Sequence, residues 1–430
     1  MAERYPSDPT PSRRGFFHAA GGGLVAATTG LAASPDGPGA PVAKPVDLPP
    51  SVHLPPFNAG TERESEGPPR SLAPAERVGY AIVGLGRLSL AEILPAFGES
   101  RRSKLVALVS GDRAKAEQVG RQYGIGPKGL YDYANFDQIR DNPEIDAVYV
   151  VLPNSMHLEY TIRSARAGKH VLCEKPMANT SAECAEMIAA CKRADRRLMI
   201  AYRCQFEPYN RAVTAMVRDR ALGMPRVITA ENCQNIGDPS QWRLKKALAG
   251  GGSLPDIGIY CLNAARVLTG EEPVEISARI VSPPGDPRFA EVEDRVAFEL
   301  AFPSGVLASC LTGYSSHESR RLRVGFDAGW ADLEAAFAYR GQRLRVARAE
   351  GKVEVVAERL IGVKNQFALE LDHLSDCLVS GRAPRTPGEE GLQDQLLMEA
   401  IYESAREGRV VRRPPSGRLD STRGPALNPS

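Results

Sequence analysis

The stretch GYAIVGLGRLS at residues 79–89 decides the fold of the N-terminal half. Its first five residues are an apolar run typical of a buried parallel strand, and Gly84-Leu85-Gly86 then leads into a helical pattern of apolar residues at positions 90, 93, 94 and 97. The glycines permit a tight turn, while the free amides and the dipole of the helix favour an anionic diphosphate. Ser89 takes the place of a third glycine, which weakens the motif without removing it. We expect a dinucleotide pyrophosphate at this turn.

Strand and helix patterns alternate from this turn to about residue 202. Strands are predicted at 105–109, 145–151 and 170–173, and helices at 156–167 and 184–192. Repeated βα units predict a doubly wound parallel sheet, whose ligands lie at the carboxyl ends of the strands. Two such ends are Pro153-Asn154-Ser155-Met156-His157 and Glu174-Lys175-Pro176. His157 is either a cofactor contact or a helix-start residue that faces water.

The end of the second strand bears on which nicotinamide cofactor is held. A site for NAD usually ends this strand with a carboxylate that binds the ribose hydroxyls, whereas here the strand ends in Ser110. Arg87, Arg113 and Lys115 lie nearby and favour the 2'-phosphate of NADP, although Arg113 also fits a solvated helix start. Asp112 is the alternative, because a small shift in register would point its carboxylate at the ribose.

The second half has a different pattern. Strand-like segments at 274–281, 292–302 and 306–312 are separated by hairpin signals, and helical patterns follow at 366–378 and 392–406. The predicted fold class is therefore α/β followed by α+β. A Rossmann-type doubly wound sheet comes first, and a C-terminal domain with a large, mainly antiparallel open sheet comes second.

Lys175 and the run GGGSLPDIGIY at residues 250–260 are the candidate catalytic elements. Ser253 can cap a helix with Pro255 in its first turn, which places Asp256 and Tyr260 four residues apart on one face. An ordinary tyrosine is a poor base at neutral pH, but an adjacent ammonium and an oxidised nicotinamide would both favour the phenolate. The alternative is a helix-start aspartate beside a structural tyrosine.

Composition limits the class of protein. A length of 430 residues predicts two domains, and 54 basic against 52 acidic residues, mixed along the chain, argue against a nucleic-acid partner. All eight cysteines follow residue 172 without a CxxC pair, so we expect no metal site, and their apolar contexts favour free thiols.

The first 76 residues have the pattern of an exported protein. Paired arginines at 13 and 14, two phenylalanines and a short weakly apolar stretch ending in Leu31-Ala32-Ala33 predict a twin-arginine signal peptide at 1–34. The stretch is too short to anchor the chain in a membrane. We therefore expect a periplasmic protein exported already folded by the twin-arginine machinery, which suits a tightly held cofactor. The proline-rich segment 35–76 is a linker or an extended arm, and its composition favours the linker.

Together these motifs resemble the Gfo/Idh/MocA oxidoreductase family, from the signal peptide to about residue 412. The resemblance is carried by residues 79–86, 131–133, 152–155, 173–177, 202–204, 241–244 and 250–260. Tyr260 stands where most members of the family carry histidine, which narrows the resemblance to one branch of exported sugar oxidoreductases. Ala201 and Gln205 depart from the family pattern, and residues 314–363 agree with it little, so the second sugar stays open.

The resemblance implies a two-step reaction on a non-dissociating NADP. Glucose would give up a hydride from C1 to become gluconolactone, and fructose would then be reduced to sorbitol. Lys175 would polarise the sugar oxygens, Tyr260 would exchange the proton, and Asp256 would hold the sugar. The resemblance implies cofactor contacts at the turn, at the strand ends and in the second domain: Gly84, Leu85, Gly86, Arg87, Leu88, Ser110, Lys115, Leu152, Pro153, Asn154, His157, Glu174, Lys175, Arg203, Trp242 and Arg243.

The family also implies an assembly and a domain layout. The segment 35–76 would be an arm that wraps a neighbouring subunit, in a homo-oligomer that is a dimer or a tetramer built on open sheet faces. The NADP-binding domain would span 77–202, the substrate-binding and oligomerisation domain 203–412, and a flexible tail 413–430. Two alternatives keep the fold: a periplasmic aldose dehydrogenase or aldose–aldose oxidoreductase with other sugars, and a non-catalytic sugar-binding protein.

Overall fold

The computed structural model describes residues 72–427. The predicted signal peptide and most of the predicted arm lie outside the described residues. The end of the arm, Pro74–Glu76, forms a single 3-10 turn before the first strand. Among the helices described, none is both long and apolar enough to cross a membrane.

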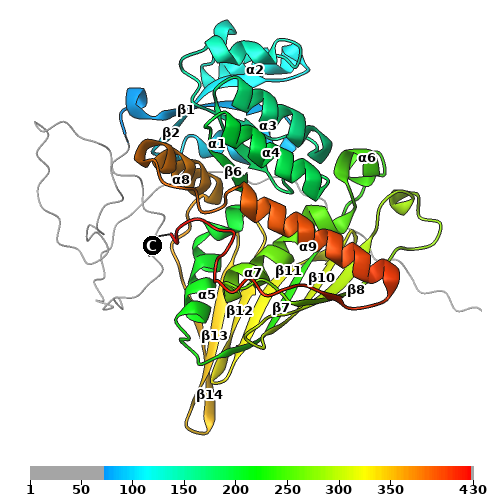
Figure 1. Cartoon of the computed structure of the whole chain (residues 1–430). Coiled ribbons are helices and arrows are strands. Elements are labelled where there is room, and N and C mark those ends of the chain that lie inside the picture. The colour runs from blue at the N-terminus through cyan, green and yellow to red at the C-terminus, as the bar shows by residue number, and fades with distance from the viewer. Residues whose placement is uncertain (1–71, 428–430) are drawn as a thin grey trace, which may run out of the picture. The chain divides into compact units, whose positions relative to one another are not determined.

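The N-terminal part is a six-stranded parallel sheet in the order β3-β2-β1-β4-β5-β6. The labels β1, β2 and β6 mark this sheet in Figure 1. Its strands are β1 (Val78–Val83), β2 (Ser103–Val109), β3 (Leu130–Tyr131), β4 (Ala147–Val150), β5 (His170–Glu174) and β6 (Leu198–Ala201). This strand order is that of the dinucleotide-binding fold and confirms the predicted doubly wound sheet.

Helices cover both faces of this sheet, which is why every residue of β1 is buried. The helices are α1 (Leu94–Ala96), which continues a π-turn (Ser89–Ile93), α2 (Arg113–Tyr123), α3 (His157–Arg166) and α4 (Ser181–Arg193). Ala81 and Val83 share one core with residues of α3 and α4, while Tyr80 and Ile82 share a second core with residues of α1 and of a later helix, α8. Leu90 was expected to face inward, but it is 39% exposed, because the π-turn adds a residue and rotates it outward.

The C-terminal part is a nine-stranded sheet in the order β14-β13-β12-β11-β7-β10-β9-β8-β15. Its strands are β7 (Pro225–Asn235), β8 (Glu275–Val281), β9 (Arg295–Ala301), β10 (Leu307–Gly313), β11 (Ser315–Phe326), β12 (Gly329–Glu334), β13 (Arg343–Glu350), β14 (Val353–Arg359) and β15 (Val411–Arg412). β7 and β10 run parallel, and every other neighbouring pair is antiparallel. The prediction of a large, mainly antiparallel sheet is confirmed.

The helices of this part mostly pack against the two sheets. They are α5 (Pro208–Arg218), α6 (Lys246–Ala249), α7 (Ile259–Thr269), α8 (Gln366–Ser380) and α9 (Gly388–Glu407). α5, α7 and α9 lie over one face of the nine-stranded sheet (Figure 1). α8 returns to the first sheet, where the hydroxyl of Tyr80 donates to the carbonyl of Leu371 at 3.2 Å. All eight cysteines are free thiols, and Cys204 alone among them is more than slightly exposed.

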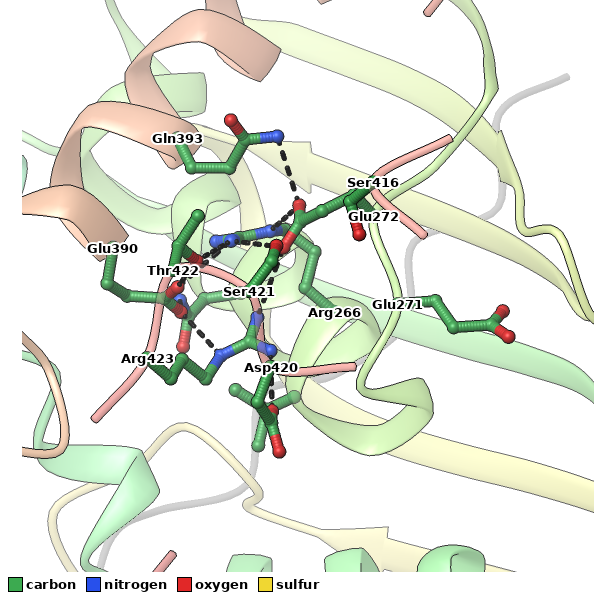
Figure 2. A network of polar contacts seen from close by, with 12 residues as sticks. Arg266, Glu271, Glu272, Glu390, Gln393, Ser416, Asp420, Ser421, Thr422 and Arg423 are labelled. Atoms are coloured by element: carbon green, nitrogen blue, oxygen red, sulfur yellow. Dashed lines mark hydrogen bonds and ion pairs between the residues drawn. The ribbon is translucent and has the colours of Figure 1, made fainter. Parts of the chain in front are cut away.

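Within the predicted flexible tail, residues 420–424 pack against the protein, whereas residues 414–419 are exposed (Figure 2). Arg423 is 7% exposed and its Nε donates to Glu390 at 2.9 Å. Glu390 also binds the fully buried Arg266 at 2.9 Å and the hydroxyl of Thr422 at 2.6 Å. Buried charges require partners, so the tail is held by completing this network, and Leu427 adds an apolar contact with the core of the N-terminal part.

Candidate active site

The glycine turn has the geometry that a pyrophosphate needs. Gly84 has a φ of +97°, and a Cβ there would lie 2.2 Å from the carbonyl oxygen of Val151. A Cβ on Gly86 would meet nothing within 4 Å, so a ligand can approach that backbone. Ser89, in the place of the third glycine, donates its hydroxyl to the Gly84 carbonyl at 2.5 Å and braces the turn. Leu85 is buried and Leu88 half-buried beside it.

The residues after β2 include the groups on which the choice between NADP and NAD depends. Asp112 caps α2 by accepting the amide of Lys115 at 3.0 Å, so its carboxylate is occupied at the helix start. Arg113 forms an ion pair with Glu117 at 2.8 Å. Arg87 and Lys115 are exposed, and Ser110 is nearly buried. Near the end of β2 the structure thus places two exposed cations and a carboxylate that caps the helix through one of its oxygens.

The carboxyl ends of β4 and β5 form the next part of the site. Leu152 is buried, Pro153 is half-buried, and Asn154 donates its amide to the carbonyl of Ala249 at 2.9 Å. His157 has no exposed surface, and its two ring nitrogens lie 2.9 Å from the carbonyls of Leu152 and Pro176. The ring therefore ties these two loops together. It can touch a ligand only if the loops move.

The end of β5 places a carboxylate directly before Lys175. Glu174 accepts the hydroxyl of Tyr149 at 2.7 Å. Burial raises the pKa of Glu174, although the ammonium of Lys175 opposes that shift. Glu370 of α8 lies behind this pair, 3.5 Å from the same hydroxyl, and burial raises its pKa well above the ordinary value.

Asp256 is the centre of the candidate catalytic cluster. Its carboxylate lies 3.3 Å from Nζ of Lys175 and 3.2 Å from Nε of Arg243, and it accepts the hydroxyl of Tyr314 at 2.7 Å. Lys175 also donates to the backbone carbonyl of Asp256 at 2.6 Å. Burial acts to raise the pKa of Asp256, but the two cations outweigh burial and lower it well below its usual range. The two cations therefore favour the ionised form of Asp256.

Tyr260 lies beside this cluster, and its hydroxyl has a different cation as its partner. Nε of Arg203 donates to the Tyr260 hydroxyl at 3.2 Å, and the guanidinium carbon lies 4.7 Å from the centre of the ring. Nζ of Lys175 lies 4.9 Å from the ring centre and is directed at Asp256 instead. Burial raises the pKa of Tyr260, and Arg203 opposes that shift. From the sequence, Lys175 was the expected cation next to the phenol. In the structure the cation that contacts the hydroxyl is Arg203.

The helix that carries Asp256 and Tyr260 begins as expected but is capped differently. A π-turn (Leu254–Gly258) precedes α7, with Pro255 in its first turn. Ser253 makes no capping bond, and its hydroxyl has no partner. The carboxylate of Glu293 accepts the amides of Gly252 and Leu254, at 2.8 and 3.0 Å, in its place. Both candidate residues still face one side.

Other predicted contacts line the same region. Arg243 stacks on Trp242, with the guanidinium carbon 4.7 Å from the ring centre. Arg203 is 4% exposed and donates to Tyr260, Gln366 and the backbone of Phe337, so most of its donors are engaged by the protein. Within residues 72–427, no group of three or more metal-ligating side chains is placed to hold an ion.

Sequence analysis missed Tyr314 and Gln366, which complete the partners of Asp256 and Arg203. Tyr314 lies in the region that agrees little with the family, and a buried tyrosine at a strand end has no local signal of its role. Gln205, one of the two departures from the family pattern, points away from the site and bonds Asn263 and Glu390 in the buried network.

The fold and the site together define an oxidoreductase that uses a nicotinamide dinucleotide. A family described as "Oxidoreductase family, NAD-binding Rossmann fold" matches residues 78–202, and the "GFO/IDH/MocA C-terminal domain" matches residues 210–332. The chain belongs to the Gfo/Idh/MocA family of oxidoreductases, and several similar proteins are named for reactions on sugars.

Three relatives illustrate this. D-xylose 1-dehydrogenase [NADP(+)] of Haloarcula marismortui is 31% identical over 78% of this chain and 93% of its own length. 1,5-anhydro-D-fructose reductase of Ensifer adhaerens is 27% identical over 77% of this chain and 97% of its own. The crystal structure of aldose-aldose oxidoreductase from Caulobacter crescentus, complexed with glycerol, shares 51% identity over 78% of this chain and 100% of that chain, with a TM-score of 0.76.

Proposed function

We propose that this protein is an NADP-dependent aldose oxidoreductase that oxidises one sugar at C1 and passes the hydride to a second sugar without releasing the cofactor. The observation that carries the proposal is the convergence of Lys175 and Arg243 on Asp256 beside Tyr260, next to the ends of β4 and β5. The relative with 51% identity is an aldose–aldose oxidoreductase, which favours an aldose as the second sugar. Fructose, implied by the sequence resemblance, is the second candidate.

NADP, when bound, supplies the acceptor and the donor of the hydride. Gly86 would approach its pyrophosphate, and Arg87 and Lys115 would hold the 2'-phosphate. The xylose dehydrogenase relative, which carries NADP(+) in its name, also supports NADP over NAD.

The protein's own residues account for the movement of the proton. Lys175 and Asp256 present a cation and an acceptor that can orient a sugar hydroxyl. Tyr260 takes the proton of the C1 hydroxyl in the first half-reaction and returns a proton to the second sugar. Arg203 stabilises the phenolate form of Tyr260, which is present before the oxidation of the first sugar and is formed again when the second sugar is reduced.

The first test is the absorbance of reduced nicotinamide in the extensively dialysed protein, with sugars added and no free nucleotide. The band should rise with glucose or another aldose and fall with a second sugar. A fall with a second aldose but not with fructose identifies aldose–aldose transfer, and a fall with fructose identifies the glucose–fructose reaction. No band with any sugar, even after NADP is added, would refute the proposal and favour a sugar-binding protein.

A variant tests the residue assignment. Lys175→Met should abolish hydride transfer while the cofactor stays bound. Lys192→Met is the matched control. It removes an exposed ion pair between Lys192 of α4 and Glu389 of α9 and should behave as wild type. Normal turnover in Lys175→Met would exclude the proposed site.

We also propose that residues 1–34 direct the protein to the periplasm by the twin-arginine route and that the protein is a homo-oligomer. Val227 and Leu307, paired on the neighbouring strands β7 and β10, are 51% and 56% exposed, which supports a contact on that face. Cell fractionation of the wild type and of a variant with both arginines of 13–14 changed to lysine tests the route. Light scattering of the purified protein tests the assembly.

A further inference from the structure

Residues 335–342, which we call the strap, connect β12 to β13 and have a fixed backbone at both ends. Ala335 has a φ of +51°, a left-handed conformation that is unfavourable for a residue with a Cβ. Gly341 has a φ of +84° near the other end. A strained alanine persists only where the surrounding contacts hold it, so the conformation of the strap is determined by what it touches.

The first half of the strap packs against the candidate catalytic residues. The carbonyl of Phe337 accepts Nη2 of Arg203 at 2.7 Å, and the Phe337 ring centre lies 6.0 Å from that of Tyr260. The ring of Tyr339 lies 4.6 Å from the guanidinium carbon of Arg203. Gln366 of α8 donates to the carbonyl of Tyr339 at 2.9 Å. The strap thus forms one wall of the reaction centre.

The other half of the strap reaches the nucleotide-binding part. The guanidinium of Arg340 forms a forked ion pair with Glu92, at 2.8 and 3.3 Å. Glu92 lies in the π-turn that follows the glycine turn Gly84–Gly86. Arg340 is 71% exposed and Glu92 13%, so the pair lies at the surface and can open without unfolding the core.

We propose that the strap retains the nicotinamide half of the cofactor and that the Arg340–Glu92 pair is its latch, so that this pair determines how slowly the cofactor leaves. The inference rests on the proposed function, because it explains how a cofactor could stay bound between the two half-reactions. A dinucleotide would extend from the glycine turn to Tyr260, and the strap contacts an element at each of these two ends. Opening the latch frees the segment that joins them.

The test is the rate at which NADPH, loaded onto the full-length protein and followed by its fluorescence, is released into an excess of NADP. Arg340→Gln and Glu92→Gln should each release NADPH faster than wild type, by up to about fivefold, because an exposed ion pair contributes little more than that factor. The double exchange Arg340→Glu with Glu92→Arg should return the rate towards that of wild type. Added salt should speed release from the wild type by a larger factor than from the single variants, because only the wild type also loses the latch.

Arg226→Gln is the matched control. It removes an exposed forked pair with Asp327, at 2.7 and 3.2 Å, that lies within the nine-stranded sheet and contacts neither the strap nor the nucleotide half. Its release rate should equal that of the wild type. Release from Arg340→Gln and Glu92→Gln at the rate of this control would overturn the proposal, as would a double exchange that is no slower than the single variants.

The assay needs no sugar, so it separates this proposal from the proposed function. If no sugar reduces the bound cofactor, the proposed function fails while the comparison of release rates still decides the role of the strap. If sugars turn over normally and Arg340→Gln releases NADPH at the control rate, the strap proposal alone fails.

Discussion

Replacing Arg203 by glutamine should move the pH dependence of sugar oxidation to higher pH. Arg203 is the cation that donates directly to the hydroxyl of Tyr260, at 3.2 Å, within a buried setting. A cation next to a phenol favours the phenolate, so its removal leaves burial unopposed and raises the pKa of Tyr260 further. Oxidation needs the phenolate, so the rising limb of the plot of rate against pH moves to higher pH.

The size of the effect follows from the hydrogen bond. A bond to a charged group contributes about 1.5–3 kcal/mol, and one pKa unit corresponds to about 1.4 kcal/mol. The pKa of Tyr260 should thus rise by about one to two units in Arg203→Gln. Near neutral pH the oxidation rate should fall about tenfold to a hundredfold. The deficit should narrow as the pH rises, because the phenolate then forms without the cation.

The assay is the single-turnover reduction of bound NADP by an aldose, measured over about pH 6 to 10, with Arg203→Lys as the conservative variant that should recover part of the shift. Arg163→Gln is the control. It removes another arginine that stacks on aromatic rings, at 4.9 and 5.1 Å, but lies on α3 away from Tyr260.

Arg203 also supports the carbonyl of Phe337 and Gln366, so the variant should be less stable, and thermal unfolding is measured separately. A rate that falls equally at every pH, with the rising limb unmoved, would show that Arg203 is only structural and refute the reasoning.

Three further predictions follow from other contacts. Tyr314→Phe removes the 2.7 Å donor to Asp256 and should lower kcat/KM for the aldose about tenfold with unchanged cofactor affinity; an unchanged kcat/KM would contradict a role in the site. Glu390→Gln removes the carboxylate that the buried Arg266 and Arg423 share, and it should reduce the free energy of unfolding by about 3–5 kcal/mol in urea titrations. A loss below about 1 kcal/mol would show that this network does not stabilise the fold. Burial lowers the pKa of His170 and of His373 from 6.5 to about 4, and it also lowers the pKa of His157. Since these rings stay neutral in the folded state and the unfolded chain binds protons first, stability should fall as the pH drops from about 6.5 towards 4, by about 1.4 kcal/mol per pH unit for each histidine. His373→Gln should reduce that slope by about a third, and an unchanged slope would refute the assignment.

Sequence patterns were informative where one residue type repeats at the period of one element. The apolar run that forms β1 is buried on both faces, so it could be predicted without knowing which elements pack against it. The predicted bounds of α8 agree with the structure to within two residues. α9 begins at Gly388, four residues earlier than predicted, because Pro387 starts the helix and the first buried positions are polar.

Strands β11–β14 and the tail were missed for a common reason. Arg321, Arg323 and Arg345 gather around the buried carboxylate of Asp332 on one face of the sheet, so charged residues alternate with apolar ones at positions that look solvated. In the tail, Arg423 is likewise buried with its partner Glu390. The buried carboxylates of Asp332 and Glu390 find their arginine partners outside their own elements, and composition alone predicts that such carboxylates are exposed.

The sequence by itself determined the glycine turn, the lysine after β5, and the four-residue spacing of Asp256 and Tyr260, because each depends on local backbone geometry. The tertiary structure decided which side chain contacts the hydroxyl of Tyr260 and which side chains contact the carboxylate of Asp256. Arg203 lies 57 residues from Tyr260, and Tyr314 lies 58 residues from Asp256. Partners separated in this way meet only when the two sheets and α8 pack together, and burial then sets the protonation of each group in that shared interior.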